Sequence, residues 1–153
     1  METNVLELVD NAFVQIAYSA EARNVYLDMD RAKDYLVLID KDVILRVLVN
    51  LFSNAVKYSP RDAAIRVELS EGENQTLKFS VFNSGPHIPS EHQDMIFQRF
   101  VHSEARSTSG IQSTGLGLTY CKMAVEGHSG QIGVKSELDK EVEFWFTLPG
   151  LVK

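Results

Sequence analysis

The 153-residue chain has little of what marks several large classes of protein. Its single cysteine, Cys121, can form no internal disulfide and has no companion thiols for a zinc site, which suits a reducing compartment. No apolar run approaches the ~20 residues that cross a bilayer. The first residues are acidic where a secretory signal would be basic. These absences favour one globular domain, and we expect it to be cytoplasmic and not inserted in a membrane.

Basic residues are also scarce. The chain has 15 lysines and arginines against 21 acidic residues, a net charge of −6. Non-specific nucleic-acid binding depends on lysine and arginine neutralising phosphates, so it is not expected here.

Common catalytic motifs are missing as well. The sequence has no Gly-x-x-x-x-Gly-Lys-Ser/Thr phosphate loop, no Gly-x-Gly-x-x-Gly between a strand and a helix, no Gly-x-Ser-x-Gly elbow and no His-Glu-x-x-His. The histidines are scattered, mostly at predicted loop positions: His87, His92, His102 and His128. At such positions a surface histidine is more common than a metal ligand.

What the chain does contain is a predicted helix with two different faces, capped by Asp40 and ended by Ser59-Pro60. One stripe carries Asn50, Asn54 and Lys57. The apolar residues fall on the opposite side: Ile44, Leu48, Leu51 and Ala55. Asparagine is a poor helix former, so the polar stripe is either a solvated face or a surface that grips a phosphate and its metal.

Periodicity predicts the remaining elements. They are a helix over 4–18 capped by Asn4, strands over 25–29 and 35–39, a hairpin of 65–69 and 77–81, a short helix over 91–97, a mobile loop over 101–114, a helix from 115–118 to about 127, and strands over 132–136 and 142–148. The sum is α+β, a two-layer sandwich in which a mixed, mainly antiparallel sheet is covered on one face by three helices. We expect a single domain over 1–153.

Two further segments carry polar and glycine residues. Asn83-Ser84-Gly85-Pro86-His87-Ile88 follows a predicted strand, where an amide and a glycine turn could meet an aromatic base. Gly115-Leu116-Gly117-Leu118 opens a helix, whose backbone N–H groups could cradle a phosphate. Taken singly, these segments are also compatible with a tight turn and a helix cap.

In this order, the segments resemble a family. Four pieces look like the N box, first glycine box, F box and second glycine box of sensor histidine kinases: Asn54-Ala55-Val56-Lys57-Tyr58-Ser59, Asn83 to Pro89, Ile96-Phe97-Gln98-Arg99-Phe100 and Thr114-Gly115-Leu116-Gly117-Leu118. Their order and spacing are similar to the catalytic ATP-binding domain of the GHKL (Bergerat-fold) superfamily, over essentially the whole chain.

The resemblance implies roles at matching positions. Asn54 would ligate Mg²⁺, Asn50 would assist at the phosphates and metal, and Lys57 would offer a charge to the phosphates. Phe97 and Phe100 would anchor a lid. The other positions implied in nucleotide binding are Tyr58, Asn83, Gly85, His87, Ile88, Arg99, Arg106, Thr114, Gly115, Leu116, Gly117, Leu118 and Thr147, with Arg99 and Arg106 available to the γ-phosphate.

The chain departs from the family pattern at several positions. The family usually has Asp where this chain has Asn83. We expect the Asn83 oxygen to face the adenine amino group with its NH₂ turned away, giving weaker and less selective binding. His87 replaces a glycine and could crowd the base, and Ser113 replaces another. Asp139-Lys140-Glu141 replaces a glycine-rich turn that we expect to be remote from the pocket.

The implied function is that of a protein-histidine kinase catalytic domain. It would bind Mg-ATP and donate the γ-phosphoryl group to a histidine on a separate dimerisation domain, with a response regulator as indirect partner in two-component signalling. The expected acceptor histidine and dimerisation helices are absent, so we expect a monomeric domain of a longer kinase that cannot autophosphorylate alone.

Two alternatives stay open. One is a degenerate regulatory module that acts through partner-domain contacts, suggested by Asn83, His87 and Ser113. The other is a hydrolase or serine kinase of the same superfamily. Such relatives use a Glu as general base where this chain has Asn50, which takes no proton at neutral pH.

Overall fold

The computed structural model describes residues 2–29, 32–93, 95–98 and 117–152. At its centre lies helix α3 (Lys41–Tyr58). The Asp40 side chain accepts a hydrogen bond from the Val43 amide at 3.3 Å and so caps the first turn. At the other end the Ser59 hydroxyl donates to the Ala55 carbonyl at 2.7 Å, one residue before Pro60. The sequence signals at both ends of this helix are therefore confirmed.

A five-stranded sheet packs against α3. Its strands are β2 (Tyr26–Asp28), β4 (Ala64–Glu71), β5 (Thr76–Asn83), β7 (Val142–Pro149) and β6 (Ile132–Lys135), in the spatial order β2-β4-β5-β7-β6. β2 runs parallel to β4, and the other neighbours are antiparallel. β4 and β5 form the predicted hairpin.

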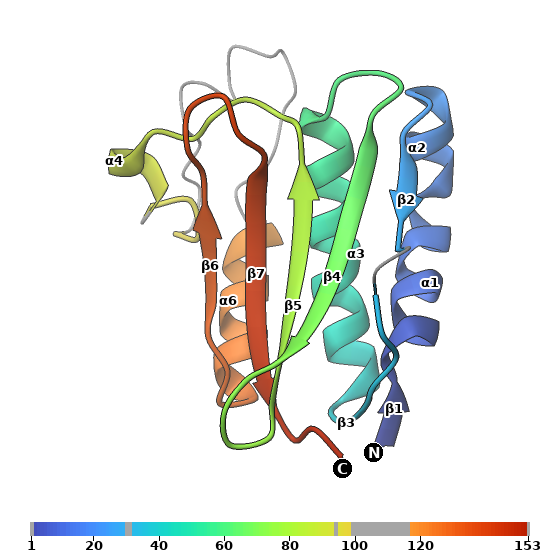
Figure 1. Cartoon of the computed structure of the whole chain (residues 1–153), viewed down its shortest axis with the longest axis vertical. Helices are drawn as coiled ribbons and strands as arrows, with labels where there is room; N and C mark the ends of the chain where they lie inside the picture. The colour runs from blue at the N-terminus through green and yellow to red at the C-terminus, as the bar shows by residue number, and fades with distance from the viewer. Residues whose placement is uncertain (1, 30–31, 94, 99–116, 153) are drawn as a thin grey trace.

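Helices cover one face of this sheet, as Figure 1 shows. They are α1 (Val5–Gln15), α3 and α6 (Gly117–Gly127), with the short α2 (Ala17–Ala22) following α1. Alternate residues of β7 point into the layer between sheet and helices, and Phe79 stacks on Phe146 there with ring centroids 4.5 Å apart. The predicted α+β sandwich, with a mainly antiparallel sheet covered on one face, is confirmed.

The apolar side of α3 forms much of this core. Its buried side chains are Ile44, Val47, Leu48, Leu51, Phe52, Ala55, Val56 and Tyr58. Burying a Leu, Ile, Val or Phe side chain contributes roughly 1.5–3 kcal/mol. The packing therefore fixes the rotation of α3 about its axis, and with it the direction of the polar stripe.

Some elements differ from the sequence predictions. The first helix divides at Ile16, whose backbone leaves the helical region at φ −112° and ψ 11°. The short helix after β5 is only α4 (Ser90–Gln93). β3 (Leu36–Leu38) pairs with β1 (Glu2–Asn4), which the pattern did not predict, in a separate two-stranded sheet. Residues 101–114, predicted as a loop, lie outside the described residues.

Within the described ranges, none of the helices combines the length and apolar character needed to span a membrane.

Cys121 and His128 are among the side chains that connect α6 and its C-terminal end to α3 and its N-terminal cap. Cys121 is fully buried, with its thiol 3.7 Å from the Val47 carbonyl oxygen. The Nε2 atom of His128 accepts a hydrogen bond from the Asp40 backbone amide at 3.1 Å. The ring hydrogen of the neutral imidazole must therefore lie on Nδ1, which donates to the Ala124 carbonyl at 2.9 Å. His128 is thus a structural link between the start of α3 and the end of α6.

Burial of Cys121 makes stability depend on pH. Burial raises the pKa of the Cys121 thiol to about 12 from 9.0. Because the folded pKa is the higher one, the folded protein keeps a proton that the unfolded chain loses. We expect the free energy of unfolding to fall above about pH 9, by up to about 1.4 kcal/mol per pH unit, until the folded pKa is reached.

Urea unfolding of the wild type and Cys121→Ala across this pH range measures the effect. The difference in unfolding free energy between the two proteins should shrink as the pH rises. A difference independent of pH would show that the thiol titrates normally in the folded protein.

Candidate functional site

The polar stripe of α3 meets the start of α6. Asn50, Asn54 and Lys57 are each half-buried, so the stripe is not a freely solvated face. A Cβ placed on Gly117, the first residue of α6, would lie 3.5 Å from the Asn50 side-chain oxygen. Segments far apart in the sequence therefore come together along one side of α3.

The loop after β5 passes still closer to α3. A Cβ on Gly85 would lie 2.6 Å from the Tyr58 carbonyl oxygen and 2.7 Å from the Asn83 side-chain oxygen. Real Cβ atoms do not approach backbone oxygen so closely, so only glycine fits without movement of the loop. In Figure 1 the end of β5 and the end of α3 lie at the same end of the molecule.

Two asparagine amides at this corner carry unpaired nitrogens. The Nδ2 atoms of Asn54 and Asn83 are buried and have no hydrogen-bond partner within the described structure. The cost of such a group is roughly 1–3 kcal/mol, and most buried polar groups are paired. The two amides are therefore candidates for contacts with a bound ligand.

The orientation of Asn83 corrects one expectation. Its Oδ1 accepts a hydrogen bond from the Gly85 backbone N–H at 2.8 Å. A backbone N–H can only donate, so the atom facing it must be the amide oxygen. The predicted orientation, with the oxygen toward a base and the NH₂ turned away, is wrong in this structure.

A buried serine at the end of β6 holds the loop that follows Asn83. The Ser136 hydroxyl accepts a hydrogen bond from the Ile88 amide at 2.9 Å and lies 3.1 Å from Nδ1 of His87. The Gln93 side chain donates to the Ile88 and Ser136 carbonyls at 2.8 and 2.9 Å. His87 thus contacts the end of β6, and Ile88 is fully buried.

These contacts also correct the expectation about the turn over 139–141. Val142, directly after that turn, is the register partner of Asn83, and Ser136 precedes the turn. The turn therefore lies at the same end of the sheet as the loop over 84–89 and is not remote from it. Asp139 adopts φ 63°, in the left-handed region that glycine adopts more readily than other residues.

The described part of the F-box segment, which ends at Gln98, lies beside α6. Phe97 is buried and packs edge-on against Phe144, with ring centroids 6.3 Å apart. The Thr119 hydroxyl donates to the Phe97 carbonyl at 3.1 Å. Leu118 is partly buried against the core. The start of α6 is therefore tied to the residues that precede the segment over 99–116.

Thr147 lies apart from the other predicted site residues. It pairs with Lys78 on β5, whereas Asn83 pairs with Val142 at the other end of β7. Its hydroxyl accepts a hydrogen bond from the Gln131 amide at 3.0 Å. We leave Thr147 out of the candidate site. The predicted positions outside the described residues are Arg99, Phe100, Arg106, Thr114, Gly115 and Leu116.

Sequence reasoning missed residues that build the site's walls. Val142 is fully buried beside Asn83, because directly opposed residues of an antiparallel pair share a face. Ser136 fixes the loop. Knowledge of the register between β5 and β7 would have placed Val142 opposite Asn83. No local sequence pattern marks Ser136, among the serines of the chain, as the residue that holds the loop.

The polar side chains of the stripe are better suited to magnesium that is bound together with a nucleotide than to a metal ion held by protein ligands alone. Within the described ranges no three His, Cys, Asp or Glu residues gather as a metal site. Mg²⁺ keeps several waters and substrate phosphate oxygens and needs few protein ligands, so an amide oxygen from Asn54 is compatible with it.

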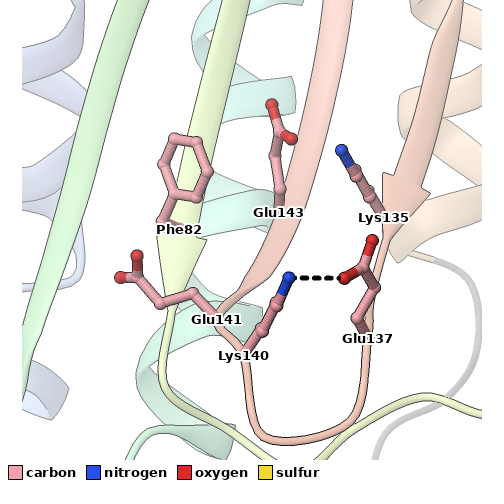
Figure 2. Close-up of a pocket in the computed structure, with 6 residues that line it drawn as sticks. All are labelled: Phe82, Lys135, Glu137, Lys140, Glu141 and Glu143. Atoms are coloured by element: carbon pink, nitrogen blue, oxygen red, sulfur yellow. Dashed lines mark ion pairs between the residues drawn. The ribbon is translucent and has the colours of Figure 1, made fainter.

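A separate hollow of about 230 Å³ lies on the opposite face of the sheet. Figure 2 shows the residues that line it: Phe82, Lys135, Glu137, Lys140, Glu141 and Glu143. Lys140 pairs with Glu137 at 3.0 Å and thereby lowers the pKa of the Glu137 carboxyl. Arg66 pairs with Glu141 at 2.7 Å and lies over the Phe82 ring. Several of the charges that line the hollow thus form ion pairs, and the sheet separates the hollow from α3.

Fold and site together define the class, a two-layer α+β domain in which two glycine segments flank a polar helix face. A family model described as histidine kinase-, DNA gyrase B-, and HSP90-like ATPase matches residues 39–151. The chain belongs to this family of ATPases.

Sensor kinases are among its relatives. The chain is 38% identical over 113 residues to the adaptive-response sensory kinase SasA of Gloeothece citriformis, covering 74% of the chain and 28% of that protein. It is 33% identical over 145 residues to the sensor protein SrrB of Staphylococcus aureus, covering 95% of the chain and 25% of SrrB. The chain thus spans about a quarter of the length of these curated relatives.

A solved structure shares the fold over nearly the whole chain. The nucleotide-free catalytic domain of histidine kinase ThkA aligns with a TM-score of 0.80 and 30% identity, over 98% of this chain and 95% of that one.

Removing the Ser136 hydroxyl tests the loop anchor. We expect Ser136→Ala to lower the free energy of unfolding by about 1–3 kcal/mol, because the buried Ile88 amide loses its acceptor. Ser70→Ala, an exposed serine on β4, is the matched control and should change stability by less than about 0.5 kcal/mol. Urea unfolding measures both variants. Equal stability of the two variants would contradict an anchoring role for Ser136.

Proposed function

We propose that this domain binds Mg-ATP along the polar stripe of α3 and donates the γ-phosphoryl group to a histidine on a separate domain. The observation that carries the proposal is the convergence of Gly85 and Gly117 on α3, beside unpaired buried amides. Glycine backbone can lie close to a base or a triphosphate, and the unpaired amides can form hydrogen bonds with them.

Each residue of the stripe has a distinct part in this proposal. Asn54 offers an amide oxygen to the metal, and Lys57 offers a mobile positive charge to the phosphates. Asn50 sits where the helix beginning at Gly117 meets α3, and so helps to fix the distance between them. Bound magnesium would neutralise phosphate charge, while the chain's own residues orient the nucleotide.

Asn50 also favours transfer over hydrolysis. A carboxylate there could accept a proton from water or a serine hydroxyl, whereas an amide cannot at neutral pH. An imidazole acceptor needs no such base, because neutral imidazole is itself a nucleophile. The acceptor we propose is therefore a histidine on a dimerisation domain, in a cytoplasmic two-component system that passes the phosphoryl group to a response regulator.

The relatives support this assignment. SasA and SrrB are named as a sensory kinase and a sensor protein, and the matched region is about a quarter of each. The regulatory module without nucleotide binding, acting through partner contacts, is the alternative that the following experiment separates.

Replacing Asn54 tests the metal and phosphate contact. Calorimetric titration with Mg²⁺ and a non-hydrolysable ATP analogue should show binding to the wild type and at least about tenfold weaker binding to Asn54→Ala, since a ligand to the metal is lost. Asn11→Ala, an exposed asparagine on α1, should bind like the wild type.

Two results would contradict this. Unchanged affinity of Asn54→Ala would remove Asn54 from the site. No binding to the wild type up to millimolar nucleotide would favour the regulatory module.

Phosphate release separates transfer from hydrolysis. With saturating Mg-ATP, we expect the domain alone to turn over far more slowly than ~1 s⁻¹, the low end of ordinary enzyme turnover, because Asn50 is not a general base. Asn54→Ala gives the background rate. Sustained hydrolysis well above that background would instead indicate a free-standing hydrolase.

A further inference from the structure

The C-terminal end of α3 presents a backbone carbonyl that water does not reach. Ser59, which directly follows the helix, is buried and precedes Pro60. The last carbonyls of a helix have no partner within the helix, and a buried carbonyl without a donor costs free energy. A donor to the Ser59 carbonyl must therefore come from another element.

Arg23, directly after α2, supplies that donor. Its Nη2 atom donates to the Ser59 carbonyl oxygen at 2.6 Å, although 36 positions separate the two residues in the chain. In Figure 1 α2 lies at the same end of the molecule as the end of α3. A cation at this end of a helix meets the negative end of the helix dipole, and charge-assisted hydrogen bonds are stronger than neutral ones. Arg23 thus completes the end of α3 from outside the helix.

Further bonds hold Arg23 in place. Its Nε atom is buried and has no hydrogen-bond partner among the described residues, so the guanidinium is partly inserted into the protein. The Arg23 carbonyl accepts from the Asp62 amide at 3.1 Å. The neighbouring Asn24 side chain donates to the Asp62 carboxylate at 2.7 Å. These bonds join the end of α2 to the segment that follows α3.

The carbonyl that Arg23 holds is next in the chain to the one that the loop after β5 contacts. A Cβ on Gly85 would lie 2.6 Å from the Tyr58 carbonyl oxygen, and Tyr58 directly precedes Ser59. The Gly85 N–H in turn donates to the Asn83 oxygen. Because peptide units are planar, a movement of the Ser59 carbonyl also moves the Tyr58 carbonyl. The contacts therefore run without a break from Arg23 to the loop after β5.

We propose that Arg23 is a positioning residue of the nucleotide site. It holds the last turn of α3, and with it Lys57 and the loop at Gly85, in the geometry that binds nucleotide, without touching the nucleotide itself. The proposal rests on the proposed function. Arg23 precedes the residues that match the family model, 39–151, so the segment before the match contributes to the site.

Arg23→Met tests the proposal, because it removes the donor and keeps an unbranched side chain. Calorimetry with Mg²⁺ and a non-hydrolysable ATP analogue, at a temperature at which circular dichroism shows the variant to be folded, gives the dissociation constant. We expect binding about tenfold weaker than in the wild type, since a buried carbonyl beside the loop loses its donor. A role in stability alone would leave the dissociation constant of the folded protein unchanged.

Arg61→Met is the matched control for charge. Arg61 is exposed two residues after Ser59, and its Nη1 atom makes only a long contact of 3.4 Å with the Ala22 carbonyl. This variant removes the same charge from the same segment and leaves the Ser59 carbonyl paired. Its dissociation constant should stay within about twofold of the wild-type value.

Amide NMR of the nucleotide-free protein gives a second readout. Arg23→Met should shift the Gly85 backbone signal and the Asn83 side-chain NH₂ signals, whereas Arg61→Met should leave them in place. Should Arg23→Met fail to fold, Arg23→Gln, whose shorter side chain does not reach the Ser59 carbonyl, replaces it in both measurements with the same expectations.

The outcomes separate this proposal from the proposed function. If the wild type and Arg23→Met bind the nucleotide equally well, the positioning role is overturned and nucleotide binding stands. Equal losses in Arg23→Met and Arg61→Met would also overturn it, because charge and not the bond to Ser59 would then be responsible. If the wild type binds no nucleotide, both proposals fall.

Discussion

The close approach of the loop after β5 to the last turn of α3 is the constraint on which the site depends. Gly85 leaves no room for a side chain between the Tyr58 carbonyl and the Asn83 amide. That contact fixes the loop against α3 and supplies the N–H that holds the Asn83 oxygen. Ser136 fixes the same loop from the other side through Ile88. The corner is therefore built before any ligand arrives, which lowers the entropy lost on binding.

Features encoded by local periodicity and caps could be predicted from the sequence. The apolar side of α3, its capping by Asp40 and the β4–β5 hairpin follow from side-chain spacing, because helix and strand periods differ and each element buries one face. The polar stripe was ambiguous by itself. Its contact with Gly117, and the contact of Gly85 with the end of α3, could not be predicted from one segment alone, since no single segment determines what it packs against.

Features that depend on tertiary contacts could not be predicted. The orientation of the Asn83 amide is set by one backbone N–H two residues away, and the predicted orientation was the reverse. Thr147 matched a family segment, but its register with Lys78 places it at the far end of β7. The turn before Val142 was expected to be remote from the pocket, but the register between β5 and β7 places it at the same end of the sheet as Asn83. Strand β1 needs β3 as a partner and has no periodicity of its own.

We propose above all that nucleotide occupies the corner formed by α3, the end of β5 and the start of α6. Two-dimensional amide NMR of the 153-residue chain, with and without Mg²⁺ and a non-hydrolysable nucleoside triphosphate, tests it most directly. We expect the side-chain NH₂ signals of Asn54 and Asn83 and the Gly85 backbone signal to shift, while the backbone signal of Ser70, at the other end of the sheet, stays in place. Shifts confined to the hollow on the opposite face of the sheet, with Asn54 and Asn83 unmoved, would contradict this placement.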